Sequence, residues 1–138
     1  MNAEIRFTVE GKPEPQGSIR NVGHRGGKAI LTSDNPNLHA WREAVGYSAR
    51  AARLTPGIMA HKDTPVRVDI EFHLERPPSA PKSRQSATVK PDLDKLCRAI
   101  LDALTGILWQ DDGQVTRINA SKHYAPKPYA SIIVEVLA

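Results

Sequence analysis

Hydrophobic and polar residues alternate along two stretches of the chain, a period typical of β-strands with one buried face. The first stretch lies near the N-terminus, where Ile5, Phe7 and Val9 are separated by polar residues. The second and more regular one runs from Val66 to Leu74. Two further strands are predicted near the C-terminus, at 115–124 and 129–137.

Two other stretches repeat apolar residues at spacings of three and four, which predicts amphipathic helices. The first spans about residues 37–53, with Pro36 before it and Thr55-Pro56-Gly57 after it as start and stop signals. The second spans about residues 93–105 and is closed by Gly106. Each helix has one apolar stripe, so we expect both to pack on a sheet.

Two segments lack any such period and are predicted to be basic loops. Residues 11–36 are rich in glycine, proline and polar residues and carry Lys12, Arg20, Arg25 and Lys28. A loop of this length either grips a ligand or is disordered, and the sequence leaves both readings open. Residues 76–91, RPPSAPKSRQSATVKP, hold prolines and basic residues with no acidic one.

The order of elements is therefore β-α-β-α-β-β, and the predicted fold class is α+β. A chain of 138 residues is long enough for one compact domain with a single core and too short for two. We expect a single domain over residues 1–138, built from a small, mostly antiparallel sheet with helices packed on it.

The charge balance points modestly toward an anionic partner. Lysine and arginine number 19 against 15 acidic residues, and the isoelectric point is near 9.4. The N-terminus does not resemble a signal peptide, and no window approaches the ~18 apolar residues of a membrane span. The single Cys97 cannot form an internal disulfide. We therefore expect a cytoplasmic protein with no membrane partner.

Carboxylates gather around the second helix. Asp92 and Asp94 stand at its start, Arg98 follows Asp94 at i+4, and Asp111 and Asp112 come soon after its end. A solvated helix face with one capping aspartate is the ordinary explanation of such a pattern. A cap, however, needs only one carboxylate, so the second acid at the helix start is surplus.

Mg²⁺ prefers oxygen ligands and is commonly held by a few carboxylates together with water and substrate phosphate. Asp-x-Asp with a distant third aspartate supplies such ligands, and Mn²⁺ is the expected substitute ion. A helix of about 13 residues is roughly 20 Å long, so Asp112 meets Asp92 only if the 106–112 turn folds back along the helix. Trp109, buried against the helix, is the expected anchor of that turn.

Other catalytic chemistry finds little support in the sequence. Cys97 lies on the apolar stripe of the second helix, and Ser18 has no histidine at a motif spacing to activate it. The five histidines show no zinc-binding spacing.

The run KPDLDKLCRAILDALTGILWQDDGQV, from Lys90 to Val115, resembles the signature of the RusA family of Holliday junction resolvases. The similarity covers about a fifth of the chain, and the following strand also fits, including Lys122 before Tyr124. The opening GKPEPQGSIR looks like the N-terminal segment of many phage and prophage members, and this resemblance implies a bacterial or phage-infected bacterial cell.

This resemblance implies a homodimer that binds four-way DNA junctions and makes paired nicks, using Mg²⁺ and an acidic triad. The triad falls on Asp92, Asp94 and Asp112, with Asp111 as a less certain contributor. The family's essential lysine, one helical turn after the second aspartate, is Arg98 here, and its usual asparagine is Lys95. Arg98 can stabilise phosphate charge, but it cannot give up a proton.

The cations flanking these acids are candidate DNA contacts, because an acidic metal site needs positive charge to accept a polyanion. Lys90 and Lys122 are the preferred phosphate contacts, with Lys12 and Arg20 behind them, and Lys95 adds a cation beside the acids. Two other functions stay open. One is a non-catalytic junction-binding or nucleic-acid-binding protein with structural carboxylates. The other is a sugar-transferring enzyme, for which the chain lacks a Gly-rich nucleotide-binding turn.

Overall fold

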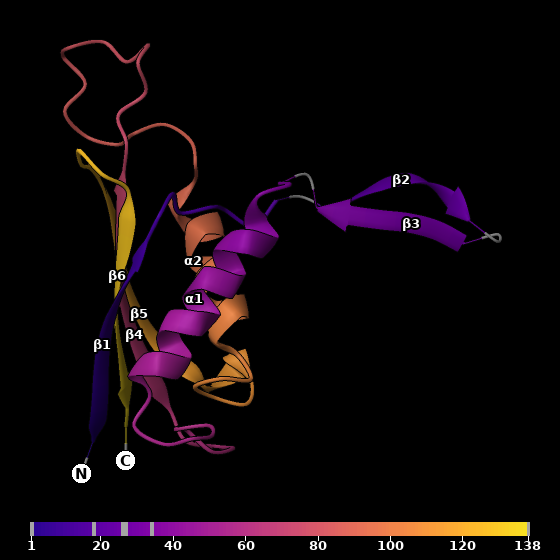
Figure 1. Ribbon diagram of the computed structural model, residues 1–138, viewed down its shortest axis with the longest axis vertical. Helices are drawn as coiled ribbons and strands as arrows, with labels where there is room; N and C mark the ends of the chain where they lie inside the picture. Colours follow the sequence, from indigo (N-terminus) through magenta and orange to yellow (C-terminus); the bar gives the residue numbers. More distant parts are fainter. Residues whose placement is uncertain (1, 18, 26–27, 34, 138) are drawn as a thin grey trace.

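The structure, a computed structural model, describes residues 2–17, 19–25, 28–33 and 35–137, and for residues 19–33 it describes the backbone alone. The predicted α+β order is confirmed (Figure 1). Its elements are β1 (Ala3–Glu10), α1 (Leu38–Ala52), β4 (Val66–Leu74), α2 (Leu93–Leu104), β5 (Val115–Tyr124) and β6 (Tyr129–Val136). A short 3₁₀ helix, η1 (Asp112–Gln114), directly precedes β5.

The long N-terminal loop was predicted without regular structure, and this expectation is wrong. Strands β2 (Ile19–Arg25) and β3 (Lys28–Ser33) pair antiparallel and form a separate two-stranded sheet (Figure 1). The sequence carries a signal for it, since Gly26-Gly27 separates two short runs as a hairpin turn does. The many glycine and polar residues around these runs concealed that signal.

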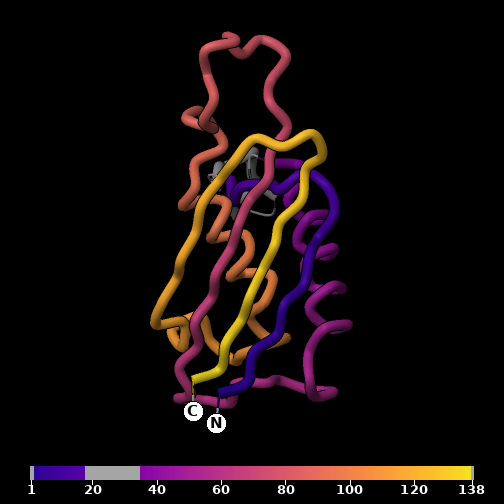
Figure 2. Tube along the Cα trace, turned by 90° about the vertical axis from the view of Figure 1, so that its left-hand side faces the viewer, coloured from indigo at the N-terminus to yellow at the C-terminus, as the bar shows by residue number. Residues whose placement is uncertain are grey.

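The main sheet has the strand order β1-β6-β4-β5. The β1–β6 and β6–β4 pairs are antiparallel, as expected, whereas β4 and β5 are parallel. A parallel pair needs a long crossover, and the chain from residue 75 to residue 114, which contains α2, provides it. Strand β5 thereby becomes an edge strand that lies next to α2 (Figure 2).

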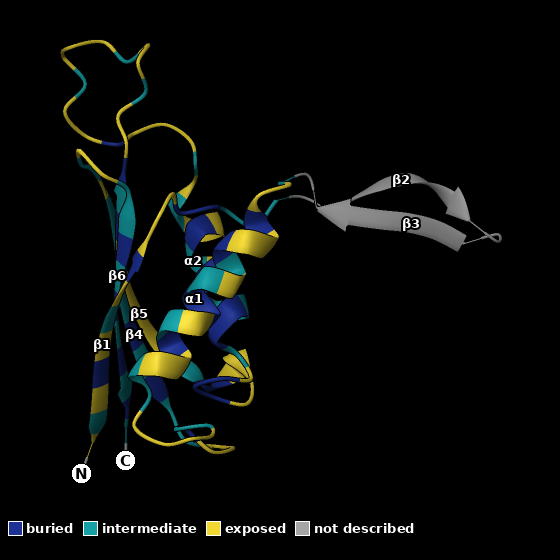
Figure 3. Cartoon of the chain, in the orientation of Figure 1, coloured by how far each residue is buried: buried dark blue, intermediate teal, exposed yellow. Residues whose placement is uncertain are grey.

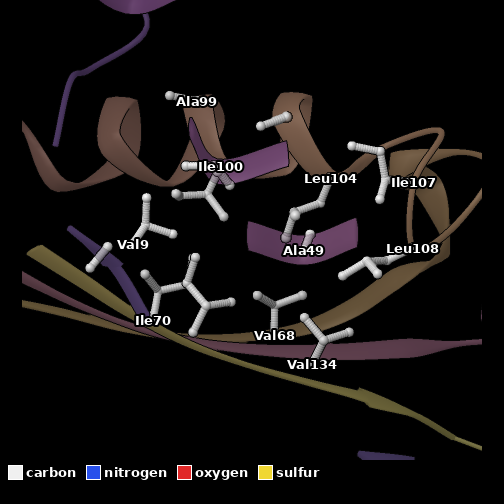
Figure 4. Packing of buried hydrophobic residues seen from close by; sticks show 14 of the residues in the cluster. Val9, Ala49, Val68, Ile70, Ala99, Ile100, Leu104, Ile107, Leu108 and Val134 are labelled. Carbon is white, nitrogen blue, oxygen red and sulfur yellow. The ribbon is translucent and has the colours of Figure 1, made fainter. Parts of the chain in front are cut away.

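Both helices pack on the same face of this sheet and enclose the core (Figures 1 and 3). Figure 4 shows side chains of α2 pointing into the core toward those of β4 and β6, among them Ile100, Leu104, Val68 and Val134, all fully buried. Each buried aliphatic side chain of this kind contributes ~1.5–3 kcal/mol. The apolar stripe of α2 is thus fixed against the sheet, and its remaining face is available for chemistry.

The opposite face of the sheet carries no helix and is lined by mixed charges. Arg67 of β4 lies 3.2 Å from a carboxylate oxygen of Glu4 and 3.2 Å from one of Asp69. Arg67 is therefore engaged with acids within the protein, whereas the acids predicted to form the site lie at the start of α2, on the helix side. No helix in the described part of the chain is long and apolar enough to cross a membrane.

Candidate active site

Asp92 and Asp94 are both exposed at the start of α2. Asp92 is the N-cap residue by position, yet its side chain accepts no capping hydrogen bond. Neither carboxylate forms a hydrogen bond or ion pair with any described residue. The acids that were predicted to be surplus to capping are therefore free, and free carboxylates are hard oxygen donors for a divalent cation.

Three predicted cations surround Asp92 in one hollow of about 440 Å³. Lys12 comes from the segment just after β1, Lys90 from the segment before α2, and Lys95 from the first turn of α2. Residues far apart in the sequence thus converge on one acid. Several lysines in one hollow with a carboxylate suit a site that binds phosphate beside a metal ion.

Asp94 faces a second hollow of about 880 Å³, which runs between α2 and the edge strand β5. Arg98 lines the same hollow, but its guanidinium pairs with Asp102 at 3.3 Å. Arg98 is therefore paired with Asp102, four residues after it, and not with Asp94, four residues before it. The remaining wall is largely apolar and includes Ile118, which is 42% exposed.

Gln16 lines both of these hollows and was not predicted to belong to the site. Its backbone N–H donates to the carbonyl of Lys95 at 3.0 Å, so the segment after β1 is fastened across the first turn of α2. Glu14 of the same segment is buried and lines the hollow of Asp92. The only sequence signal for either residue is the opening GKPEPQGSIR, whose similarity to other family members carries no role for single positions.

Lys122 anchors the segment that leads into α2. Its ammonium donates hydrogen bonds of 2.8 Å to the backbone carbonyls of Val89 and Pro91. These bonds hold the chain immediately before Asp92 against the end of β5. Two of its three donors are therefore used within the protein, and the structure gives Lys122 a positioning role.

The acids after α2 lie in a turn with a different construction. Asp111 caps η1 by accepting a hydrogen bond of 2.8 Å from the N–H of Gly113. The side chain of Gln114 accepts from the N–H groups of Gln110 and Asp111 at 2.9 and 3.0 Å. Asp112 is exposed, and its carboxylate has no partner among the described residues. Of this pair, Asp111 is used in structure and Asp112 is free.

Gln114 also fixes the whole turn to a distant part of the chain. Its amide nitrogen lies 3.2, 2.9 and 3.0 Å from the carbonyl oxygens of Ala60, His61 and Thr64. The side chain is buried, so these bonds are shielded from water. Gln114 is therefore the residue that orients the Asp111-Asp112 turn, although the sequence marked it only as part of the Asp-Asp-x-Gln-Val run.

Within one chain, Asp112 does not meet Asp92 and Asp94. Asp112 precedes the first residue of β5, whereas Lys122, near the last residue of β5, contacts Pro91 beside Asp92. A strand of this length spans about 30 Å. The 106–112 turn therefore does not fold back along α2, and that expectation is wrong. Trp109 is buried as predicted, but the chain around it pairs with residues 59 and 60.

Among the described residues, no three histidine, cysteine or acidic side chains are grouped to hold a metal ion. The donor chemistry of Asp92 and Asp94 fits a hard divalent cation, but one chain supplies two ligands of the expected three. Arg20 falls in the segment whose side chains lie outside the description, so its predicted DNA contact is not located.

Cys97 lies next to this site without the properties of a nucleophile. Burial raises the pKa of its thiol above the ordinary value, and the nearby carboxylate of Asp94 raises it further. A thiol of raised pKa stays protonated and unreactive near neutral pH. The role of Cys97 is packing at the wall of the groove between α2 and β5.

The fold and the site define a small α+β protein with free carboxylates and lysines at one helix end, a combination suited to handling phosphodiesters. Residues 10–136 match the family described as endodeoxyribonuclease RusA. The chain belongs to this family, as predicted, and membership implies a nuclease of the Holliday junction resolvase type that binds DNA junctions. The uncharacterized protein YqaN of Bacillus subtilis (strain 168) is 28% identical over 144 residues, which cover 94% of each chain.

Proposed function

We propose that this protein is a Mg²⁺-dependent, structure-specific endonuclease that resolves four-way DNA junctions in the cytoplasm by paired symmetric nicks. One observation carries the proposal: at the start of α2, Asp92 and Asp94 have no partner among the described residues, and Lys12, Lys90 and Lys95 line the hollow of Asp92. Carboxylates that served only to stabilise the helix start would be expected to accept hydrogen bonds from its N–H groups, and Asp92 at the N-cap accepts none.

Asp92, Asp94 and Asp112 are the proposed metal ligands. When bound, a divalent ion such as Mg²⁺ or Mn²⁺ would polarise the phosphodiester and activate the attacking water. Lys12, Lys90 and Lys95 hold the flanking phosphates, and Arg20 extends this contact along the DNA. Arg98 stabilises negative charge on the phosphate and stays protonated throughout, because its guanidinium does not titrate.

A homodimer reconciles the three acids with the geometry of one chain. The proposed nicks are symmetric, which calls for two sites related by a two-fold axis. If the two α2 helices lie antiparallel across that axis, Asp112 of a second copy comes beside Asp92 and Asp94 of the first. The apolar groove between α2 and β5 supports this pairing, because it runs along the helix and ends at Asp94.

The groove is also unlike an ordinary solvent-facing surface. Leu93, Leu101 and Ile118 line it together, and β5 has no neighbouring strand on its outer side among the described strands. Open strand edges and apolar grooves are where chains associate. The dimer that completes the acid set therefore covers a surface that one chain leaves open.

The second candidate function is a non-catalytic junction-binding protein. It is favoured by the separation of Asp112 from the other acids, since a protein of this kind needs no converging carboxylates. It predicts junction binding without metal and no cleavage, whereas the endonuclease cuts only with metal.

The deciding experiment incubates the full-length protein with a labelled four-way junction and with linear duplex of the same sequence, in Mg²⁺ and in EDTA. We expect symmetric nicks in the junction alone and only with Mg²⁺. Asp94→Asn should stop cutting and keep junction binding, because it removes ligand charge and little volume. Glu43→Gln removes the same charge at an exposed acid of α1, away from both groups of aspartates, and as the matched control should cut normally. Binding without cleavage by the wild type in every divalent metal tested favours the non-catalytic function.

A further inference from the structure

A third hollow, which we call the proline hollow, lies beside the proposed active site and has no role in the mechanism above. It has a volume of about 410 Å³ and lies where the end of β1, the 76–91 segment and the β5–β6 connection come together. Five prolines and one tyrosine form much of its wall: Pro13, Pro77, Pro78, Pro91, Pro128 and Tyr124.

The wall has the chemistry of a stacking surface. A proline ring is rigid and apolar, and its backbone nitrogen donates no hydrogen bond. A wall built largely from prolines therefore offers an apolar surface with few backbone N–H groups that need a hydrogen-bond acceptor. Tyr124 adds an aromatic ring, the kind of side chain on which nucleobases stack. Volumes of about 300–1,000 Å³ hold ligands of small-molecule size, so this space suits one nucleobase and excludes a duplex.

The proline hollow adjoins the hollow of Asp92. Lys12, Pro13, Lys90 and Pro91 line both spaces. A DNA strand whose phosphate lies beside Asp92 therefore passes the entrance of the proline hollow within its next nucleotides. No other large hollow in the described part of the chain shares as many residues with that of Asp92.

The charges at the hollow select the same kind of ligand. Lys12, Arg76 and Lys90 line it against the single acid Glu75. An excess of cations around an apolar interior suits a ligand with an apolar ring system on an anionic backbone, which describes a nucleotide within a strand. An apolar protein segment would gain nothing from these cations.

One polar atom of the wall is left without a partner. The hydroxyl of Tyr124 is buried and forms no hydrogen bond with any described residue. Buried hydroxyl groups are normally satisfied, so an unsatisfied one points to a partner that enters from outside. The edge of a nucleobase carries both donors and acceptors and can supply that partner.

We propose that the proline hollow takes up one unstacked nucleobase from the DNA strand that lies in the active site. This inference rests on the proposed function, because a strand reaches the hollow only if the protein binds junction DNA. Capture of a base is cheapest where stacking and pairing are already weakened, as at a branch point. The hollow therefore favours junctions over linear duplex and gives the protein a position at which one base can be preferred over another.

The test uses four-way junctions in which single nucleotides near the cleaved phosphate are replaced in turn by abasic residues. Binding is measured in EDTA, so that no cutting occurs. We expect one abasic position to weaken binding by the wild type about tenfold, the size of one base-stacking contact. Ala87→Phe, which places a large side chain in the hollow, should weaken binding to the intact junction by a similar factor and make it indifferent to that abasic position.

Tyr124→Phe is the second variant, because it removes only the hydroxyl and keeps the ring. It should bind the abasic junction as the wild type does and discriminate less among the four bases at the sensitive position. Tyr129→Phe is its matched control, since Tyr129 stacks on His73 away from the hollow, and it should behave as the wild type.

Equal binding of intact and abasic junctions by the wild type at every position overturns this inference and leaves the proposed function standing. Sensitivity to the abasic position that persists unchanged in Ala87→Phe, with the variant folded by its melting temperature, overturns it as well. A wild type that binds no junction removes the proposed function and this inference together, and it does so in the first measurement.

Discussion

The two ends of α2 each carry a pair of aspartates, and the protein treats the two pairs differently. At the N-terminal end, other groups hold the backbone: Lys122 bonds the carbonyls before Asp92, and Gln16 bonds that of Lys95. Both carboxylates therefore stay free. Beyond the C-terminal end, one aspartate of the pair caps η1 and the other is free.

The comparison shows that carboxylates equally suggestive in sequence divide into three available acids and one structural acid. It also shows that the available acids are oriented by residues outside the acidic motif itself. Lys122 does this at one end and Gln114 at the other. The predictions below test whether the two ends form one site across a dimer, and then how much each orienting residue contributes.

The largest effect is expected when one proposed metal ligand is removed, at either end of α2. Asp94→Asn and Asp112→Asn should each lower cleavage about a thousandfold or more, since loss of a metal ligand removes several kcal/mol of transition-state stabilisation. Mixing the two variants and allowing subunits to exchange should restore cutting to about a quarter of the wild-type sites. Half of randomly assorted dimers are mixed, and each mixed dimer holds one intact site.

The same mixture separates the two arrangements of the acids. If the three acids act within one chain, every chain in the mixture carries a broken site and no activity returns. Single-site nicking of the junction, without the paired second cut, is the product expected from the mixed dimer. An inactive mixture whose subunits demonstrably exchange would falsify the shared site.

The next largest effect is expected at the residue that orients Asp112. Gln114→Glu replaces a donor with an anion facing the carbonyls of Ala60, His61 and Thr64, so we expect a loss of stability of about 1–3 kcal/mol. Because the Asp112 turn loses its anchor, cleavage should fall about 10–100-fold and need more Mg²⁺. Thermal melting and a Mg²⁺ titration measure the two effects separately.

Gln85→Glu makes the same chemical change at an exposed glutamine of the 76–91 segment and serves as control. A Gln114→Glu protein that melts early and yet reaches half-maximal cutting at the wild-type Mg²⁺ concentration would show that Gln114 stabilises the fold without orienting Asp112.

The sequence predicted well those elements whose residues face one environment over their whole length. Strand β4 was predicted with the bounds it has, because its alternating residues face the core and the ion-paired surface in turn. The apolar stripe of α2 was predicted for the same reason, and it located Asp92 and Asp94 at the helix start. Local periodicity reports burial, and burial decided these elements.

The direction of the chain after α2 depends on contacts that no local pattern contains. Burial of Trp109 was predicted, but its segment is held by N–H groups of Met59 and Ala60, which bond the carbonyl of Leu108. Gln114 likewise bonds residues about fifty positions away in the chain. The sequence therefore located the acids at the two ends of α2 more reliably than it placed the two groups of acids relative to one another within one chain.

A smaller effect is expected at the opposite end of α2. Lys122→Met keeps the apolar stem and removes the bonds to Val89 and Pro91, so the segment before Asp92 loosens, and we expect cleavage to fall about tenfold. The dependence of junction affinity on salt should stay unchanged, because this ammonium already bonds the protein. Lys12→Ala, by contrast, should reduce the slope of log affinity against log salt by about 1.

These slopes distinguish a positioning lysine from a phosphate-binding one. Affinities measured over a range of NaCl in EDTA provide them, with Arg50→Ala, an exposed cation in the last turn of α1, as control. A Lys122→Met protein whose slope falls as much as that of Lys12→Ala would return Lys122 to the predicted role of phosphate contact.

The smallest effect is expected at the acid that the protein uses for structure. Asp111→Asn retains a side-chain oxygen that accepts the hydrogen bond from Gly113, so η1 keeps its cap. We expect cleavage within about twofold of the wild type and a stability change of at most about 0.5 kcal/mol, because only the charge is lost and the carboxylate is exposed. Junction cleavage measures the first effect and chemical unfolding the second.

Abolished cleavage in a stably folded Asp111→Asn protein would mean that Asp111 is a metal ligand and that it gives up its capping hydrogen bond when the dimer binds the ion. Wild-type cutting leaves Asp112 as the acid that the far end of α2 contributes.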